Sequence, residues 1–181
     1  GHPDPSGVQA RALQEHLLAY PAIELVWLDF SSLPQGQRTD AENAEFFQCL
    51  RGCNLLYLNT SVLVLMDRTY MSRFWTQFEA YLSMRAVTAA GLADAADPLE
   101  RVTIVCLHRL PTVCADGLVA EWAHRTPEEA HDILAGNDVV VTNERDKSIQ
   151  LRKLVMLNEQ MREAFASGRL HYDGNNGDER T

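Results

Sequence analysis

The sequence predicts an α/β protein with a flavodoxin-like fold of three layers, in which helices cover both faces of a mostly parallel sheet. Two observations lead to this prediction. Hydrophobic residues recur at helical spacings in some segments and form short strand-like runs in others, and the two kinds of segment alternate along the chain. No repeat or low-complexity linker interrupts this alternation. Strands that alternate with helices form right-handed βαβ units, so the strands should lie parallel.

The length and composition of the chain are those of one globular domain. A chain of 181 residues fits a single domain, and a hydrophobic content of 46% is enough to build a core. We expect this domain to span residues 1–167. Residues 168–181 are polar and are expected to form a disordered tail.

The first part of the chain predicts a helix, a strand and a loop in that order. An amphipathic helix follows the proline-rich start, is capped near Ser6 and is ended by Pro21. The run Ile-Glu-Leu-Val-Trp-Leu at residues 23–28 is predicted to form a strand that stops at Asp29. Turn-forming residues then predict a loop over residues 30–38.

A capped helix, a buried strand and a long helix are predicted next. Thr39 or Asp40 caps a helix that runs towards Tyr57, with acidic residues in its first turns, where the helix dipole favours them. Residues 61–66 form a short apolar run typical of a buried parallel strand. A helix over residues 70–90 is predicted because its apolar residues recur at spacings of three and four.

The rest of the domain continues the alternation. The expected elements are a loop over 91–97, a strand over 102–107, short helices over 117–124 and 126–135, a last strand over 138–142 and a closing helix over 146–166. The second short helix has Pro127 in its first turn, where proline is well tolerated.

Charge and hydropathy disfavour several kinds of partner. The formal net charge is −9 and the only lysines are Lys147 and Lys153, so no basic cluster is present to displace counterions from nucleic acid. No run approaches the roughly 18–20 apolar residues of a membrane span, and no signal-peptide pattern opens the chain. We therefore expect a cytoplasmic protein that binds neither nucleic acid nor membrane.

The four cysteines allow two interpretations. Cys49 and Cys53 lie one turn apart on a predicted helix, and Cys106 lies two residues before His108, so these four side chains could hold a metal ion. No CxxC or HxxxH pair supports that interpretation. We favour the alternative that Cys49, Cys53, Cys106 and Cys114 are small buried apolar residues, and we expect no metal.

Ligands of parallel sheets bind at the carboxyl ends of the strands. In this sequence those ends are Asp29 with its loop, residues 67–70 and residues 108–112. Asp29 fits two roles equally, because a strand-end carboxylate can bind ribose hydroxyls or cap the following turn. His108 follows a strand and could reach a site, but we favour a structural histidine there. His131 and Asp132 are expected to face solvent.

A stripe near the second strand end carries the candidate catalytic acid. Trp75 and Glu79 are four residues apart and Ser72 lies seven before Glu79, so all three are expected on one helix face. A carboxylate beside an indole at the mouth of a sheet acquires a shifted pKa and a dry pocket. Spacing alone fits a core tryptophan and a solvated glutamate better.

The order of these motifs resembles the middle of a TIR domain, the Toll/interleukin-1 receptor homology family. The likeness spans about residues 7–90 and extends more loosely to the strand at 102–107. It is carried by Val26-Trp27-Leu28-Asp29, Leu33 and Gly36, Leu50, Asn54 and Leu55, Val62-Leu63-Val64-Leu65, Tyr70, Ser72 and Trp75-x-x-x-Glu79.

This resemblance implies a flavodoxin-like fold and, as in enzymatic TIR domains, cleavage of NAD+ at the nicotinamide–ribose bond. NAD+ is then the substrate, and no separate cofactor is implied. The cleavage passes through an oxocarbenium-like cation that a nearby carboxylate stabilises. The matching positions are Glu79 as the catalytic carboxylate and, on the substrate-binding side, Ser72, Trp75, Asp29, Phe30 and Tyr70.

The chain departs from the family pattern in two places. TIR domains begin with a central strand before the first helix, whereas this chain starts at residues 1–5, after the point where that strand is expected. Residues 108–181 are also longer than the usual ending of the family.

Two main functions follow from the sequence. One is hydrolysis of NAD+ by Glu79. The other is a non-catalytic TIR-like signalling module that associates with copies of itself or with a signalling partner. The acid at position 79 is necessary for the first function and not sufficient for it. A more remote alternative is a nucleoside or nucleotide transferase, which needs a second acid such as Asp29 or Asp67.

Overall fold

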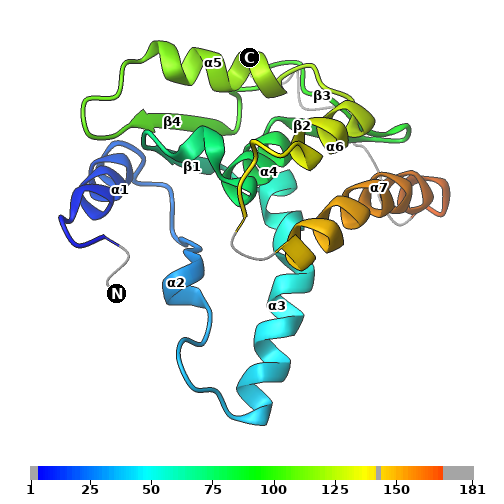
Figure 1. Cartoon of the computed structure of the whole chain (residues 1–181), viewed down its shortest axis with the longest axis horizontal. Helices are drawn as coiled ribbons and strands as arrows, with labels where there is room; N and C mark the ends of the chain where they lie inside the picture. Colours follow the sequence, from blue (N-terminus) through cyan, green and yellow to red (C-terminus); the bar gives the residue numbers. More distant parts are fainter. Residues whose placement is uncertain (1–3, 142–143, 169–181) are drawn as a thin grey trace, which may run out of the picture.

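The computed structural model describes residues 4–141 and 144–168 of the chain. Helices and short strands combine in a mixed α/β arrangement, as predicted (Figure 1). The elements are α1 (Val8–Ala19), α2 (Asp29–Ser32), α3 (Asp40–Asn59), β1 (Val62–Met66), the 3-10 helix η1 (Tyr70–Ser72), α4 (Phe74–Ser83), β2 (Arg85–Thr88), β3 (Gly91–Asp94), β4 (Val102–Cys106), α5 (Val113–Trp122), α6 (Pro127–Ala135) and α7 (Glu144–Ala166).

The parallel pairing expected for the two most apolar runs is present. β1 and β4 pair in parallel, with Val62 opposite Val102 and Met66 opposite Cys106. β2 and β3 form a separate antiparallel hairpin. Among the described residues each sheet has two strands, so the parallel sheet is smaller than the sequence predicts. α5 packs along β4, and α1 lies beside β1 (Figure 1).

The strand predicted at residues 23–28 is wrong. This segment forms no sheet pairing with any described residue, and the Leu25 side chain is 91% exposed. At its end the backbone turns into α2, because the Leu28 carbonyl accepts hydrogen bonds from the amides of Ser31 and Ser32. A strand needs a neighbour for its backbone groups, and the local sequence cannot supply one.

The last predicted strand, at residues 138–142, is reduced to a single bridge. The Val140 carbonyl accepts from the Phe74 amide at 2.8 Å, and the Val140 amide donates to the Ser72 carbonyl at 2.7 Å. This bridge joins residue 140 to the start of α4 rather than to β4. Thr142 lies outside the described residues.

The helix predicted over residues 70–90 is divided into three elements. Arg73 adopts an extended conformation, with φ −94° and ψ 129°, and separates η1 from α4. α4 ends at Ser83, and the chain then forms the β2–β3 hairpin, which replaces the loop expected over residues 91–97. The Arg85 guanidinium secures this hairpin by donating to the carbonyls of Trp122 and Ala123 and to the Asp94 carboxylate.

α1, α3, α5, α6 and α7 form near their predicted positions, whereas α2 is a short helix that begins at Asp29 and runs into the residues predicted as a loop over 30–38. Thr39 and Thr126 each complete a capping box, with Glu42 and Glu129 respectively. α1 is capped instead by the Asp4 carboxylate, which accepts from the amides of Val8 and Ala10. α5 begins earlier than expected, at Val113, and α7 begins at Glu144.

The hydrophobic core surrounds α4. Packing is aromatic at its centre, where the Tyr81 and Trp122 rings meet edge-on at 5.8 Å. The side chains with no exposed surface are Phe74, Phe78, Tyr81, Leu82, Met84, Leu118, Trp122, Ala130, Leu134 and Leu154.

α3 extends away from this core as a long rod (Figure 1). No side chain of residues 40–50, all of which the structure describes, is buried. The buried side chains of α3, Asn54 and Leu58, lie in its second half, and the helix packs against α4 and β2. No helix within residues 4–141 and 144–168 is long and apolar enough to cross a membrane.

Candidate functional site

Glu79 lies on α4, on the side of the helix that faces α3. A neighbouring side of α4 carries Phe74 and Phe78, which are completely buried and anchor the helix in the core. The i, i+4 spacing places Trp75 one turn before Glu79 on the same side, and the Trp75 side chain is 37% exposed. α4 therefore holds Glu79 rigidly at the junction between the core and α3.

The Glu79 carboxyl meets the Tyr57 hydroxyl, which comes from the packed half of α3. The Tyr57 hydroxyl lies close enough to the Glu79 carboxyl group to favour its ionised form. Burial raises the pKa of Glu79 to about 7, and the charge of Asp29 adds to this effect. The Tyr57 hydroxyl and the Arg73 guanidinium act in the opposite direction, because both stabilise the ionised carboxylate.

The Tyr57 hydroxyl stays protonated beside this carboxylate. Burial, followed by the charge of Glu79, raises the pKa of the Tyr57 hydroxyl far above its ordinary value. The Trp27 ring packs edge-on against the Tyr57 ring, with centroids 6.4 Å apart. This contact brings the segment before α2 onto α3, beside the carboxyl group of Glu79.

The charge of Glu79 also contributes to the raised pKa of two further side chains. Burial and then the Glu79 charge raise the pKa of the Cys53 thiol, which lies one turn before Tyr57 on α3, while Lys153 lowers it. Burial and then Glu79 also raise the pKa of the Tyr70 hydroxyl. The site thus combines one acid with two phenols and a thiol, and the phenols and the thiol stay protonated at neutral pH.

Only some of the predicted site residues lie near Glu79. Tyr70 is buried and near Glu79, and Asp29 is close enough for its charge to act there. The Asp29 carboxylate also accepts a hydrogen bond from the amide of the next residue, Phe30, at 2.6 Å, but α2 has no side-chain cap. Phe30 is 48% exposed on α2.

The prediction that Ser72 shares a helix face with Trp75 and Glu79 is wrong. Ser72 belongs to η1, and the extended Arg73 breaks the helical register before α4 begins. The Ser72 hydroxyl is exposed and donates to the Thr69 carbonyl at 2.9 Å. It acts as a local turn residue in this structure.

The other candidate groups lie apart from Glu79. His108 is exposed in a turn with φ 52°, so the expected packed histidine is not found. Asp132 faces solvent as expected, while His131 is partly buried and pairs with it at 3.2 Å. The Asp67 carboxylate binds Thr69 and Arg73, and these contacts outweigh its burial and lower its pKa.

The cysteines differ from the expected buried set. All four are free thiols; Cys49 is exposed, and Cys53, Cys106 and Cys114 are partly buried. Among the side chains that the structure describes, no three or more His, Cys, Asp or Glu residues gather as a metal site would require.

Tyr57 and Trp27 are not among the site residues that the sequence predicts. Tyr57 was only the expected end of a helix, and Trp27 belonged to the predicted strand. The signal in the sequence is the spacing of Cys49, Cys53 and Tyr57, which puts them at successive turns on one side of α3. That spacing shows which residues share a face and does not show that the face meets α4.

No family model, curated protein or solved structure matches this chain. The resemblance to TIR domains therefore remains a prediction from the sequence motifs.

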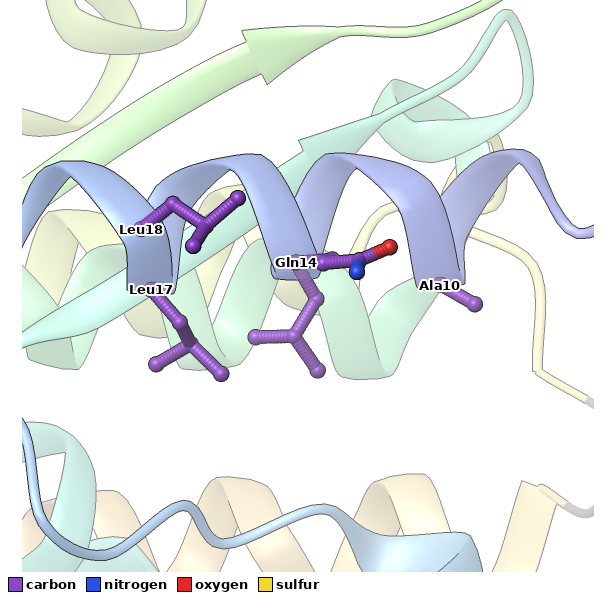
Figure 2. Close-up of a pocket in the computed structure, with 5 residues that line it drawn as sticks. Ala10, Gln14, Leu17 and Leu18 are labelled. Carbon is purple, nitrogen blue, oxygen red and sulfur yellow. The ribbon is translucent and has the colours of Figure 1, made fainter.

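A shallow hollow of about 330 Å³ lies on α1 (Figure 2). It is lined by Ala10, Leu13, Gln14, Leu17 and Leu18, and its surface is almost entirely apolar. None of these residues belongs to the group around Glu79. The hollow lacks charged or acidic side chains, so it offers no chemistry for catalysis.

Proposed function

We propose that this protein hydrolyses the nicotinamide–ribose bond of NAD+, with Glu79 as the catalytic carboxylate. One observation carries the proposal: a single acid is held where α4 packs on α3, beside the Tyr57 hydroxyl, with its pKa raised to about 7. A carboxyl group poised near neutral pH suits general-base or electrostatic catalysis. The TIR-like order of motifs supplies the substrate class.

The chemistry needs only one acid. Nicotinamide leaves as a neutral molecule with the electrons of the broken bond, and the ribose carbon becomes oxocarbenium-like. The ionised Glu79 stabilises this cation and accepts a proton from the attacking water. The products are nicotinamide, ADP-ribose and a proton. The Tyr57 hydroxyl beside Glu79 stabilises the ionised carboxylate.

The proposed activity is tested by incubating the protein with NAD+ and measuring nicotinamide release across pH. We expect kcat/KM to rise with pH and to level off above a pH of about 7, because Glu79 acts in its ionised form. Glu79→Gln should lower kcat by about 100-fold or more, since the neutral amide cannot stabilise a cation or accept the proton.

The matched control is Glu45→Gln, the same chemical change at an exposed position of α3. It should leave the rate unchanged. The absence of turnover in the wild type at every pH contradicts the proposed reaction. Turnover that survives in Glu79→Gln contradicts the assignment of the catalytic residue instead.

An interaction module is the second candidate function, and one observation favours it. The end of the segment between α1 and α2, together with the start of α2, exposes several large apolar side chains, which is typical of a surface that binds another protein. They are Leu25 (91% exposed), Val26 (45%), Trp27 (38%), Leu28 (41%) and Phe30 (48%). This candidate predicts that Glu79→Gln has no effect on the biological output.

A further inference from the structure

β1 has one edge without a partner strand. Successive residues of a strand direct their backbone groups to opposite sides, and Val62 and Met66 bond to the chain of β4 at 2.7 and 2.8 Å. Leu63 and Leu65 therefore direct their N–H and C=O groups away from β4. Within residues 4–141 and 144–168 no backbone hydrogen bond is formed on this side.

An open strand edge is a template for another strand. Leu63 and Leu65 are partly exposed, and their backbone groups on this side have no hydrogen-bond partner among the described residues. Backbone groups in such a position gain more from a strand partner than from water. The edge is therefore a site for a polypeptide segment and not for a small molecule.

The same chain carries an exposed segment that is suited to pair with this edge as a strand. Residues 24–27 have the sequence Glu-Leu-Val-Trp, and their backbone groups form no hydrogen bond with any described residue. Leu25 is the most exposed large apolar side chain of the described residues, at 91%. In an added strand, Leu25 and Trp27 would lie on one face and Glu24 and Val26 on the other.

We propose that two copies of this chain associate by strand addition, with residues 24–27 of one copy pairing along the free edge of β1 in the other. Each molecule carries both the edge and the segment, so a symmetric dimer satisfies both at once. Within one molecule these residues do not pair with β1, because Trp27 packs on Tyr57 and the backbone at Leu28 turns into α2. The inference does not depend on NAD+ hydrolysis.

The surroundings of β1 suit an apolar strand. α1 lies beside β1 and carries the apolar hollow on its own surface, where Leu17 and Leu18 are labelled in Figure 2. Leu18 at its rim is 76% exposed. Side chains of an incoming strand can be buried against this surface. The net charge of −9 repels two copies, so association should strengthen as salt screens that charge.

The test is sedimentation velocity of the full chain over a range of protein concentrations, at low and at physiological salt. We expect a monomer–dimer equilibrium that salt shifts towards the dimer. Hydrogen exchange resolved to single amides should show the Leu63 and Leu65 amides becoming protected as the dimer forms. Protection that increases elsewhere but not at these amides overturns the proposal.

Two substitutions test the donor segment. Val26→Pro shortens the pairing that residues 24–27 can form, and Leu25→Lys replaces the exposed leucine by a charge. Both should weaken association about tenfold or more without altering the monomer, because the segment is exposed there. The control is Val155→Lys, at a 49% exposed position of α7, which should associate like the wild type.

The outcomes separate the alternatives. A monomer at every concentration and salt overturns the inference, and so does a dimer that both donor variants preserve. Equal weakening by Val155→Lys and Leu25→Lys also overturns it, because the effect would then be one of charge alone. NAD+ turnover has no part in these measurements, so the two proposals fail independently.

Discussion

Glu79 is the residue on which the proposed chemistry depends, and its properties come from three separate segments. The core side of α4 fixes its backbone, the Tyr57 hydroxyl of α3 lies beside its carboxylate, and Asp29 adds a like charge. Burial outweighs the opposing effects of Tyr57 and Arg73 and keeps the carboxyl group neutral at acidic pH. A structural glutamate on a helix surface would ordinarily be solvated and fully ionised at neutral pH.

At the residue scale, this burial predicts a pH-dependent effect on stability. The folded-state pKa of Glu79 is about 7, against 4.5 in the unfolded chain. The unfolded state therefore loses its proton first, and the free energy of unfolding falls by about 3 kcal/mol as pH rises from about 4.5 to 7. Glu79→Gln carries no ionisable group and should not show this loss.

The measurement is the free energy of unfolding from urea titrations of wild type, Glu79→Gln and the control Glu45→Gln across this pH range. The difference between Glu79→Gln and wild type should grow in favour of the variant as pH rises. The difference for Glu45→Gln should stay near zero. A Glu79→Gln difference that does not change with pH would show that Glu79 is solvated.

At the element scale, α3 and α6 begin with the same capping motif and differ in how their side chains are buried. Both use a threonine–glutamate capping box. Ala130 and Leu134 of α6 are fully buried in the core, whereas the first half of α3 has no buried side chain. The local sequence is sufficient to begin each helix. The first turn contributes to the stability of the whole molecule only where the helix packs in the core.

This contrast predicts different costs for the same substitution. Thr126→Ala should lower the free energy of unfolding by about 1 kcal/mol, since it removes a cap from a packed helix. Thr39→Ala should leave global unfolding almost unchanged and increase hydrogen exchange in the first turns of α3. Thermal denaturation and amide exchange of the two variants distinguish these effects. Equal losses of global stability would show that the first half of α3, although it has no buried side chain, contributes to global stability as much as α6 does.

At the scale of the whole molecule, Arg85 joins elements that are distant in the sequence. It is 1% exposed, and its guanidinium donates to the carbonyls of Trp122, Ala123 and Arg125 as well as to the Asp94 carboxylate. These contacts close the C-terminal end of α5 and hold the β2–β3 hairpin against it. Several of the last carbonyls of a helix would otherwise lack donors.

Loss of Arg85 should therefore destabilise the molecule strongly. We expect Arg85→Ala to lower the free energy of unfolding by about 3–5 kcal/mol, because it leaves buried carbonyls without donors and opens a cavity. The control Arg68→Ala removes an exposed arginine and should cost less than about 0.5 kcal/mol. Urea denaturation of both variants checks this. Similar costs for the two would show that the Arg85 contacts are not stabilising.

The sequence by itself determined the elements whose cause is local. The apolar runs of β1 and β4, the capping boxes of α3 and α6 and the amphipathic pattern of α7 act over a few residues, so they were predictable. It also singled out Glu79, through its spacing from Trp75 and the order of the surrounding motifs.

Only the tertiary structure decided what these elements meet. Residues 23–28 have a strand-like sequence and form no strand, because a strand exists only with a neighbour to bond to. The helix predicted to run to residue 90 ends at Ser83, because the buried Arg85 secures a hairpin there. Tyr57 joined the site because α3 packs on α4, and burial at that contact sets the pKa of Glu79. Contacts between distant segments leave no periodic trace in a single sequence.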